Sequence, residues 1–214
     1  MDGKRGSNCI GIIGTNNTGK TVVSEEIIKR FNAKRDRLSK LGKKYPGNYH
    51  KLVVFDVQNR YTKYMREGDI SIMLDDEEWE DKVLALRDSL FVADDFKVLV
   101  GTDKISKKLL RIFGYRMEYG LDLVFIVWHP RLIPPRIAQF IDKYYLFRAN
   151  GNDKEYADRI NGETDEIIKC KHAIEKHCSK FSELEYGEQY PNFPFIYYNT
   201  NLNKSIKVNF NNKK

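Results

Sequence analysis

Cysteine is scarce in this sequence: its 214 residues include three, Cys9, Cys170 and Cys178. No two of them form a Cys-x-x-Cys pair. His172 and His177 lie near Cys170 and Cys178, but the spacing of these four residues matches none of the usual sets of zinc ligands. Unpaired thiols suit a reducing compartment, so the cysteine content favours the cytoplasm.

Long apolar runs are also absent. No stretch approaches the roughly 18 consecutive apolar residues that indicate a membrane-spanning helix. The first apolar strand begins at Cys9, which leaves too little sequence before it for a signal peptide. There is no internal repeat and no low-complexity tract. We therefore expect one cytoplasmic domain over residues 1–214, with enough chain for one substantial core.

The charge balance is basic, with 37 Lys and Arg against 30 Asp and Glu and a net charge of +7. A basic surface can attract a polyanionic partner. The basic residues are nevertheless spread along the chain, and such a distribution also serves solubility. Composition alone leaves both interpretations open.

One motif is specific. Residues 14–21 match G-x-x-x-x-G-K-[ST], the Walker A or P-loop pattern, at every required position. The motif follows the apolar run 9–13 and precedes residues 22–31, where apolar side chains recur with helical spacing. Strand, tight loop and helix are the context in which this motif binds phosphate. The residues expected to contact ATP are Gly14, Thr15, Asn16, Asn17, Thr18, Gly19, Lys20, Thr21 and Val22.

Each part of the motif has a chemical reason. Gly14 and Gly19 let the backbone turn so that successive N–H groups point at phosphate oxygens, at a helix N-terminus that also favours negative charge. Lys20 supplies a positive charge to the β- and γ-phosphates. Thr21 offers a hydroxyl oxygen to Mg²⁺, which takes oxygen ligands.

Hydrolysis of ATP needs acidic groups as well. The apolar run 90–93 ends on Asp94 and Asp95, and ligands of open α/β sheets bind at the carboxyl ends of strands. We expect Asp94 to hold the metal ion and Asp95 to orient the attacking water. The alternative is an ordinary strand that runs into an Asp-rich turn.

The apolar pattern predicts an α/β fold. Five core strands are expected at residues 9–13, 51–55, 90–93, 121–128 and 143–148, with a further short strand possible at 70–73. Helices are expected after the P-loop and at residues 75–88, 102–119, 134–141, 153–160 and 164–178, whereas 33–50 is expected to be a helix end and an exposed loop. A hairpin is expected from 195–198 and 205–210 after a turn-rich region at 186–194. Continuously apolar strands separated by helices favour a mainly parallel sheet covered on both faces.

One expected strand, at residues 51–55, lies in sequence between the P-loop and the acidic strand at 90–93. This order of strands resembles that of the additional-strand, RecA-like P-loop ATPases. That resemblance implies a three-layer P-loop NTPase with core strand order 5-1-4-3-2, followed by C-terminal helices and a β-hairpin. It also implies that the residue at the tip of the fourth strand faces the γ-phosphate. His129 would then be the sensor.

Within that class the chain resembles the FtsK/HerA superfamily. The resemblance rests on the P-loop and on residues 55–56, 91–95, 124–131 and 144–148, and it covers roughly residues 8–150, leaving 151–214 as an extension packed on that core. Members of the superfamily pump DNA, and they include viral genome-packaging ATPases and Zot-like phage proteins. The resemblance implies an Mg²⁺-dependent ATPase that moves double-stranded DNA as a viral or mobile-element motor, in the host cytoplasm or associated with a virion. A portal, a capsid or another packaging protein would be its partner.

The chain departs from the superfamily pattern at two positions. Asp95 stands where the family usually has Glu, and a shorter carboxylate puts the rate of hydrolysis in doubt. His129 stands where the family often has Gln, although an imidazole can still hydrogen-bond to a phosphate or to water.

The resemblance further implies a hexameric ring in which a neighbouring subunit supplies an arginine to each active site. Arg116, in the helix before the fourth strand, is the first candidate for this arginine finger, and Arg111 is the second. The alternative for either is a solvated helix arginine.

Two other functional classes remain open. Small P-loop proteins are often nucleotide or nucleoside kinases, but the sequence has no Arg-rich lid and the intervening strand favours the ATPase arrangement. A nucleotide-gated assembly protein with little turnover is the second alternative, because Asp95 replaces the usual Glu.

Overall fold

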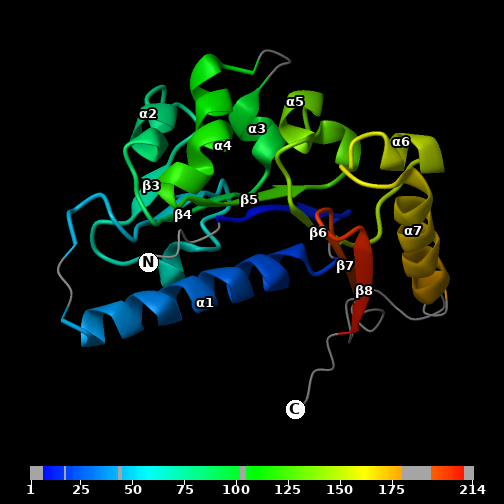
Figure 1. The fold of residues 1–214 in the computed structure, drawn as a ribbon, viewed down its shortest axis with the longest axis horizontal. Coiled ribbons are helices and arrows are strands. Elements are labelled where there is room, and N and C mark those ends of the chain that lie inside the picture. Colours follow the sequence, from blue (N-terminus) through cyan, green and yellow to red (C-terminus); the bar gives the residue numbers. More distant parts are fainter. Residues whose placement is uncertain (1–6, 17, 43–44, 102–104, 180–193, 210–214) are drawn as a thin grey trace. The chain divides into compact units, whose positions relative to one another are not determined.

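The computed structural model describes residues 7–16, 18–42, 45–101, 105–179 and 194–209. The chain forms two compact units, each built from segments that are distant in sequence (Figure 1). Unit 1 consists of Met1–Cys9 and Thr21–Ile126, and unit 2 of Ile10–Lys20 and Val127–Lys214. That residues 1–214 act as one domain stays a prediction.

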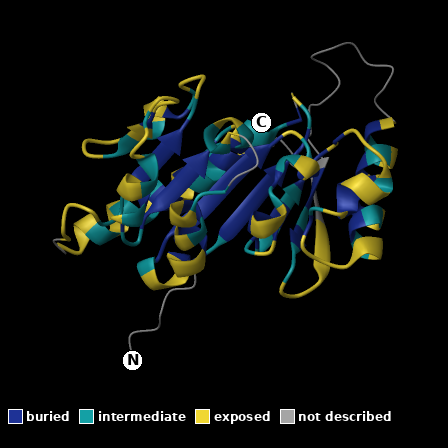
Figure 2. Ribbon diagram, turned by 90° about the horizontal axis from the view of Figure 1, so that it is seen from above, coloured by how far each residue is buried: buried dark blue, intermediate teal, exposed yellow. Residues whose placement is uncertain are grey.

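Within the part of unit 1 that the structure describes, four parallel strands form a sheet. They are β2 (Leu52–Phe55), β3 (Ile70–Ile72), β4 (Leu90–Ala93) and β5 (Asp122–Val127). Their spatial order is β3-β2-β4-β5, and every pairing is parallel. All residues of β2, β4 and β5 are buried, as expected for strands covered on both faces. Figure 2 shows these strands as the buried layer of the unit, with the exposed residues on the helices and loops around them.

Helices cover both faces of this sheet. The long helix α1 (Lys20–Lys40) lies on one face, and α2 (Trp79–Leu84), α3 (Phe96–Val100) and α4 (Lys107–Tyr119) lie on the other (Figure 1). α4 begins after Ser106, whose hydroxyl accepts a hydrogen bond from the Leu109 N–H at 2.8 Å. It ends at Gly120, whose φ of 67° is the left-handed conformation that glycine tolerates at a helix end.

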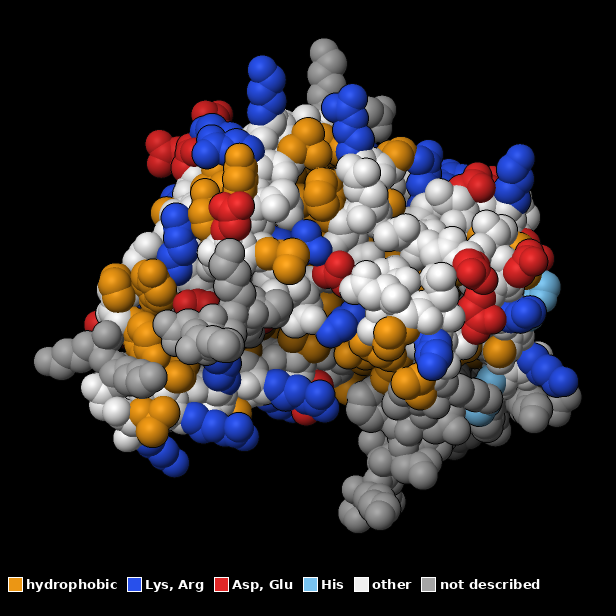
Figure 3. Space-filling view, in the orientation of Figure 1, with side chains coloured by type: hydrophobic (Ala, Val, Ile, Leu, Met, Phe, Trp, Pro, Cys, Tyr) orange, Lys and Arg blue, Asp and Glu red, His pale blue; other side chains and the backbone are white. Residues whose placement is uncertain are grey.

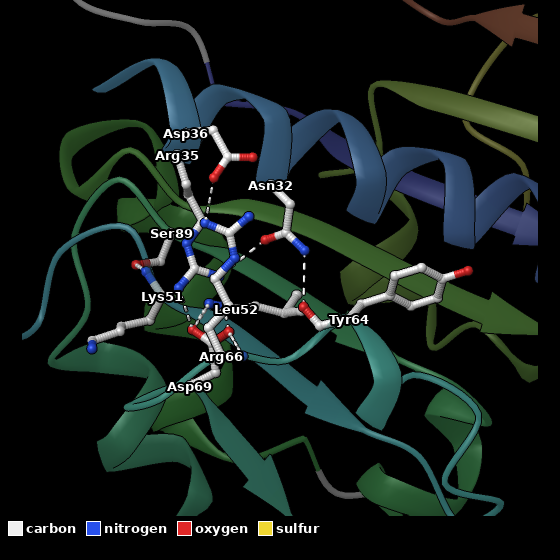
Figure 4. Close-up of polar contacts among 9 residues, drawn as sticks. All are labelled: Asn32, Arg35, Asp36, Lys51, Leu52, Tyr64, Arg66, Asp69 and Ser89. Carbon is white, nitrogen blue, oxygen red and sulfur yellow. Dashed lines mark hydrogen bonds and ion pairs between the residues drawn. The ribbon is translucent and has the colours of Figure 1, made fainter. Parts of the chain in front are cut away.

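A buried carboxylate ties α1 to the edge of the sheet (Figure 4). The side chain of Asp69, just before β3, is fully buried. It accepts two hydrogen bonds of 2.8 Å from the Arg35 guanidinium of α1. It also accepts hydrogen bonds from the backbone N–H groups of Leu52, at 3.0 Å, and Arg66, at 2.7 Å. Asp69 therefore connects α1, β2 and the segment that leads into β3.

The described residues of unit 2 form four strands: β1 (Cys9–Ile13), β6 (Lys143–Leu146), β7 (Pro194–Asn199) and β8 (Lys204–Asn209). β1 and β6 pair in parallel, whereas β6–β7 and β7–β8 are antiparallel. The expected C-terminal hairpin is thus present and extends the sheet from β6. The helices of this unit are α5 (Pro135–Ala138), α6 (Asp153–Ala157) and α7 (Thr164–Ser179).

The expected mixed α/β fold with a mainly parallel arrangement of strands is confirmed. The pairings β2–β4, β4–β5 and β1–β6 are those that the order 5-1-4-3-2 contains within each unit. The order across all five core strands stays a prediction.

Helix ends differ from the sequence expectations. The first helix continues to Lys40, and Arg35 in its last turns is held by Asp69. α2 begins at Trp79 instead of residue 75, because Asp76 accepts a hydrogen bond from the Glu78 N–H in a turn before it. α5 and α6 are also shorter than expected, and α3 was not expected. Residues 102–104 and 186–193 of the expected elements lie outside the described part of the chain.

None of the described helices combines the length and the apolar character needed to cross a membrane. The three cysteines are buried thiols. Two of the four residues considered above as zinc ligands are His172 and Cys170. The His172 ring lies 2.9 Å from the Asp153 carboxylate, and Cys170 is buried. In the described residues no group of three or more His, Cys, Asp and Glu side chains could hold a metal ion.

Candidate active site

The P-loop leaves β1 and is fastened to the neighbouring strand ends of unit 2. The Gly14 N–H donates to the Val127 carbonyl at 3.1 Å, and the Thr15 N–H donates to the Arg148 carbonyl at 2.8 Å. A Cβ atom at Gly14 would lie 2.5 Å from the Phe147 Cβ, so only glycine fits there. The first glycine of the motif is thus required by its packing against the segment after β6.

Internal hydrogen bonds shape the rest of the loop. The Thr15 carbonyl accepts a hydrogen bond of 2.8 Å from the Thr18 hydroxyl and one of 2.6 Å from the Lys20 ammonium. Gly19 has a φ of 95°, which few other residues adopt. Lys20 therefore folds back over the loop that its charge would serve. Asn17 lies outside the described residues, and Val22 is exposed on the first turn of α1.

An open pocket of about 410 Å³ lies beside the start of the loop. Its lining residues are Thr15, Asn16, Trp128, His129 and Asn150, all in unit 2. The structure thus brings the expected sensor His129 to the first residues of the P-loop. Trp128 is more than half exposed there, an unusual position for an aromatic side chain.

The orientation of His129 is set by two neighbours. Its Nδ1 accepts a hydrogen bond of 3.2 Å from the Arg131 N–H. In the neutral ring Nε2 then carries the proton and can donate to a phosphate or to water. A Cβ atom at Gly151, which has a φ of 111°, would lie 2.7 Å from Nε2. The imidazole thus lies directly against a glycine that leaves it room.

The second group of candidate residues belongs to unit 1. Thr21 begins that unit in α1, and Asp94 follows β4. The Arg60 Nη1 donates to the Thr21 hydroxyl at 3.2 Å and to the Asp94 carboxylate at 3.3 Å. Two oxygens expected to hold a metal ion thus converge on one positively charged group.

The loop after β2 holds this arrangement in place. Asp56 accepts hydrogen bonds from the Gln58 N–H, at 3.0 Å, and the Tyr61 N–H, at 2.9 Å. The fully buried Tyr61 ring places its hydroxyl 2.7 Å from the Ser24 hydroxyl of α1 and 3.4 Å from Asp94. The loop, the start of α1 and the end of β4 are therefore linked by hydrogen bonds.

The Asp94 carboxyl has an unusual electrostatic environment. Burial raises its pKa above the usual value, the Arg60 guanidinium opposes this shift, and the carboxylates of Asp56 and Asp95 add to it. An ionised Asp94 therefore needs a nearby positive charge. Burial also raises the pKa of the Tyr61 hydroxyl, which stays protonated at neutral pH and can donate.

Asp95 is exposed and lies in the left-handed region, with φ 63° and ψ 50°. Asp and Asn adopt this conformation several times more often than most residues. The backbone therefore favours Asp or Asn at this position.

The two arginine-finger candidates differ in exposure. Arg116 is buried in the last turn of α4, and its Nη1 donates to the Phe113 carbonyl at 3.1 Å. Arg111, on the same helix, is exposed and lies 6.0 Å from the centre of the Tyr115 ring. A finger that reaches a neighbouring subunit must be accessible, which Arg111 is in this conformation.

The unit 1 oxygens fit a magnesium ion. Mg²⁺ usually takes one or two protein oxygens and completes its octahedron with water and phosphate oxygens. A cationic group already lies within hydrogen-bonding distance of Thr21 and Asp94, so the site suits positive charge.

Sequence analysis missed several residues of these two groups: Asp56, Arg60, Tyr61, Trp128, Asn150 and Gly151. Their place in the sequence, at or shortly after the end of an expected strand, was the signal that could have identified them. Each follows a parallel strand at its carboxyl end, where α/β proteins bind ligands. Residues 56–61 lie between the expected strands 51–55 and 70–73, and periodicity carries no information about which residues of such a segment turn back toward the site.

No protein-family profile matches the sequence. No curated protein matches it either.

Solved structures do match. The genome packaging NTPase B204 of Sulfolobus turreted icosahedral virus 2, in complex with ATPγS, is similar with a TM-score of 0.65 and 12% identity over 94% of this chain and 96% of B204. The same protein in complex with AMPPCP gives a TM-score of 0.62. The DNA-packaging ATPase B204 of Sulfolobus turreted icosahedral virus has a TM-score of 0.64 and 13% identity over 94% of this chain and 97% of that protein. This chain therefore has the fold of the packaging NTPase B204.

Proposed function

We propose that the protein is a Mg²⁺-dependent ATPase that moves double-stranded DNA, as a viral genome-packaging or mobile-element motor. The observation that carries this proposal is the convergence of the Thr21 hydroxyl and the Asp94 carboxylate on one cationic group, with Thr21 following directly on the P-loop lysine. These two residue types, in these two sequence contexts, are what a P-loop ATPase uses to hold magnesium.

The residues divide the chemistry between them. The backbone N–H groups of the P-loop and the Lys20 ammonium would bind the phosphates. Thr21 and Asp94 would hold Mg²⁺, which neutralises charge on the β- and γ-phosphates. Asp95 would orient the attacking water, and the Nε2–H of His129 would donate to the γ-phosphate or to that water.

Two features support a packaging role. The fold matches that of B204 over nearly the whole of both chains, and B204 is a DNA-packaging ATPase. The surface also carries many basic groups: Figure 3 shows Lys and Arg side chains along the edge of unit 1 where α1 lies. On α1 the exposed basic residues include Lys29, Arg30, Arg37 and Lys40. Such a face can bind the phosphates of a duplex and release their counterions.

The motor would work as an oligomer, most simply a hexameric ring. A neighbouring subunit would supply an arginine to each active site, because the transition state of phosphoryl transfer gathers negative charge. Arg111 and Arg116 are the two candidates. A portal, a capsid or another packaging protein would direct the motor to its DNA, in the host cytoplasm or at the virion.

Two rival functions make different predictions. A nucleotide or nucleoside kinase would transfer the γ-phosphate to an acceptor, and a nucleotide-gated assembly protein would bind ATP with little turnover. The assembly protein is considered because Asp95 stands where the superfamily usually has Glu, and a shorter carboxylate could slow hydrolysis.

ATP hydrolysis, measured with and without linear duplex DNA and with a panel of nucleoside and nucleotide acceptors, separates the three. We expect Mg²⁺-dependent release of phosphate that duplex DNA stimulates, with a stimulation that declines as salt is raised. Phosphate transfer to an acceptor would favour the kinase. Binding without turnover, with or without DNA, would favour the assembly protein.

A further inference from the structure

Arg60 occupies an unusual position in unit 1. Its Nη1 lies 3.2 Å from the Thr21 hydroxyl and 3.3 Å from the Asp94 carboxylate, and its Nη2 contacts the Gln58 side chain. One guanidinium therefore bridges the two side chains that would hold magnesium. The sequence gives no hint of this, because Arg60 lies 39 residues from Thr21 and 34 from Asp94.

The backbone around Arg60 is firmly held while its side chain is not enclosed. Asp56 accepts hydrogen bonds from the N–H groups of residues 58 and 61, on either side of Arg60. Tyr61, the next residue, is fully buried and contacts Ser24. The Arg60 side chain is 38% exposed, against 16% for Asp94. The main chain is thus fixed, whereas the guanidinium has a path to solvent.

The negative charge of Asp94 favours a cation at the position of the Arg60 guanidinium. Asp94 is a largely buried carboxylate, and removing the partner of a buried charge is costly. The Arg60 guanidinium pairs with the Asp94 carboxylate at 3.3 Å. Magnesium binds oxygens at about 2.0–2.1 Å in a near-octahedral shell. A guanidinium and a magnesium ion therefore cannot share the same two oxygens.

We propose that Arg60 is a built-in competitor of magnesium: it occupies the position between Thr21 and Asp94 before nucleotide binds, and Mg²⁺ must displace it. This inference rests on the proposed function, since it concerns the metal of the same site. In this account Arg60 keeps Asp94 neutralised between rounds of nucleotide binding and raises the magnesium concentration that the site requires. Displacement moves a side chain on a fixed backbone, so it needs no rearrangement of the fold.

Binding of a fluorescent non-hydrolysable ATP analogue, mant-AMPPNP, tests this without any turnover. For each variant the dissociation constant is measured in EDTA and in excess Mg²⁺, and the ratio of the two gives the gain in affinity that magnesium provides. Arg60→Gln removes the charge and keeps a hydrogen-bond donor. We expect its ratio to exceed that of the wild type by about twofold to fivefold, the range of a partly exposed ion pair. The magnesium concentration at half-saturation should fall in parallel.

Arg66→Gln is the matched control. The Arg66 side chain is 40% exposed, close to the 38% of Arg60, but it pairs with Asp36 and not with a residue of the candidate site. Its ratio should equal that of the wild type. Arg60→Lys keeps the charge but loses the planar fork, and its ratio should lie between the wild type and Arg60→Gln. Circular dichroism and thermal unfolding establish whether each variant is folded. If Arg60→Gln does not fold, the comparison of Arg60→Lys with the wild type is the test.

The outcomes separate this inference from the function beneath it. A wild type that binds mant-AMPPNP more tightly with Mg²⁺, together with an unchanged or smaller ratio in the Arg60 variants, overturns the competition and leaves the ATPase proposal intact. A wild type that does not bind mant-AMPPNP under either condition overturns both.

Discussion

The Arg35 guanidinium grips the Asp69 carboxylate with two parallel hydrogen bonds, each 2.8 Å long, and the Asp69 side chain is fully buried. Because the pair joins α1 to the sheet edge, we expect Asp69→Asn to destabilise the protein. Loss of one partner leaves the other charge unpaired, which costs about 3 kcal/mol or more for a buried pair. Urea denaturation followed by circular dichroism measures this change.

The neighbouring pair of Arg66 and Asp36 is the control for that measurement. It joins α1 to the same segment at 2.8 Å, but both side chains are substantially exposed. Asp36→Asn should therefore leave the free energy of unfolding close to that of the wild type. Equal destabilisation by the two substitutions would contradict the central role that we assign to Asp69.

Gly151 should be needed for catalysis through His129. An alanine there places Cβ against the His129 Nε2 and also requires an unfavourable positive φ. We expect Gly151→Ala to slow ATP hydrolysis by about tenfold or more while ATP still binds, because a sensor that loses its position loses transition-state contacts. Steady-state hydrolysis and nucleotide binding are measured side by side.

Gly42→Ala is the control that separates the effect of a strained backbone from the effect of a Cβ contact with His129. Gly42 also has a positive φ, but a Cβ atom there would meet nothing within 4 Å. Its hydrolysis rate should match the wild type. In His129→Ala, addition of Gly151→Ala should cause little further loss. Fully additive losses would mean that Gly151 does not act through His129.

Asp95 should be the residue that governs turnover. Asparagine tolerates the left-handed backbone of this position, so Asp95→Asn should remain folded. We expect it to bind Mg·ATP normally and to hydrolyse it more slowly by about 10²–10⁴, the range for a lost general base. Asp94→Asn should instead lose the benefit of Mg²⁺ for binding. Wild-type turnover in Asp95→Asn would place the base elsewhere.

Arginine substitution should reveal contributions between subunits. If Arg111 acts on a neighbour, Arg111→Ala is inactive alone but regains part of its activity when mixed with Lys20→Ala, because each supplies what the other lacks. The same mixing experiment with Arg116→Ala tests the first candidate, whose burial makes a stability measurement a necessary companion. Activity of the wild type should also rise more steeply than linearly with protein concentration. Linear dependence and no recovery in either mixture would indicate a monomeric enzyme.

The strands and the phosphate loop could be predicted because they depend on local sequence. The apolar runs of β1, β2, β4, β5 and β6 are long enough to identify buried strands, and the P-loop pattern constrains both glycines. Helix ends were harder to predict. The last turns of α1 are rich in basic residues that suggest a loop, yet Arg35 is held by Asp69, a contact 34 residues away in sequence.

The motifs pointed to Thr21 and Asp94 as candidate metal ligands, and the structure brings both side chains to Arg60. Their role in holding a metal ion stays a prediction. Arg60 itself could not be found from periodicity, because its role comes from the turn that Asp56 and Tyr61 impose. The burial of Arg116 also escaped prediction, since an arginine on an amphipathic helix is usually solvated.

Movement of DNA is the central claim, and a triplex-displacement assay tests it most directly. A labelled third strand is annealed to a linear duplex, and its release is followed after addition of protein and ATP. We expect the wild type to displace the strand with ATP and Mg²⁺ but not with AMPPNP, and Lys20→Ala to displace nothing, since it lacks the phosphate-binding charge. ATP hydrolysis by the wild type without any displacement of the third strand would contradict the account.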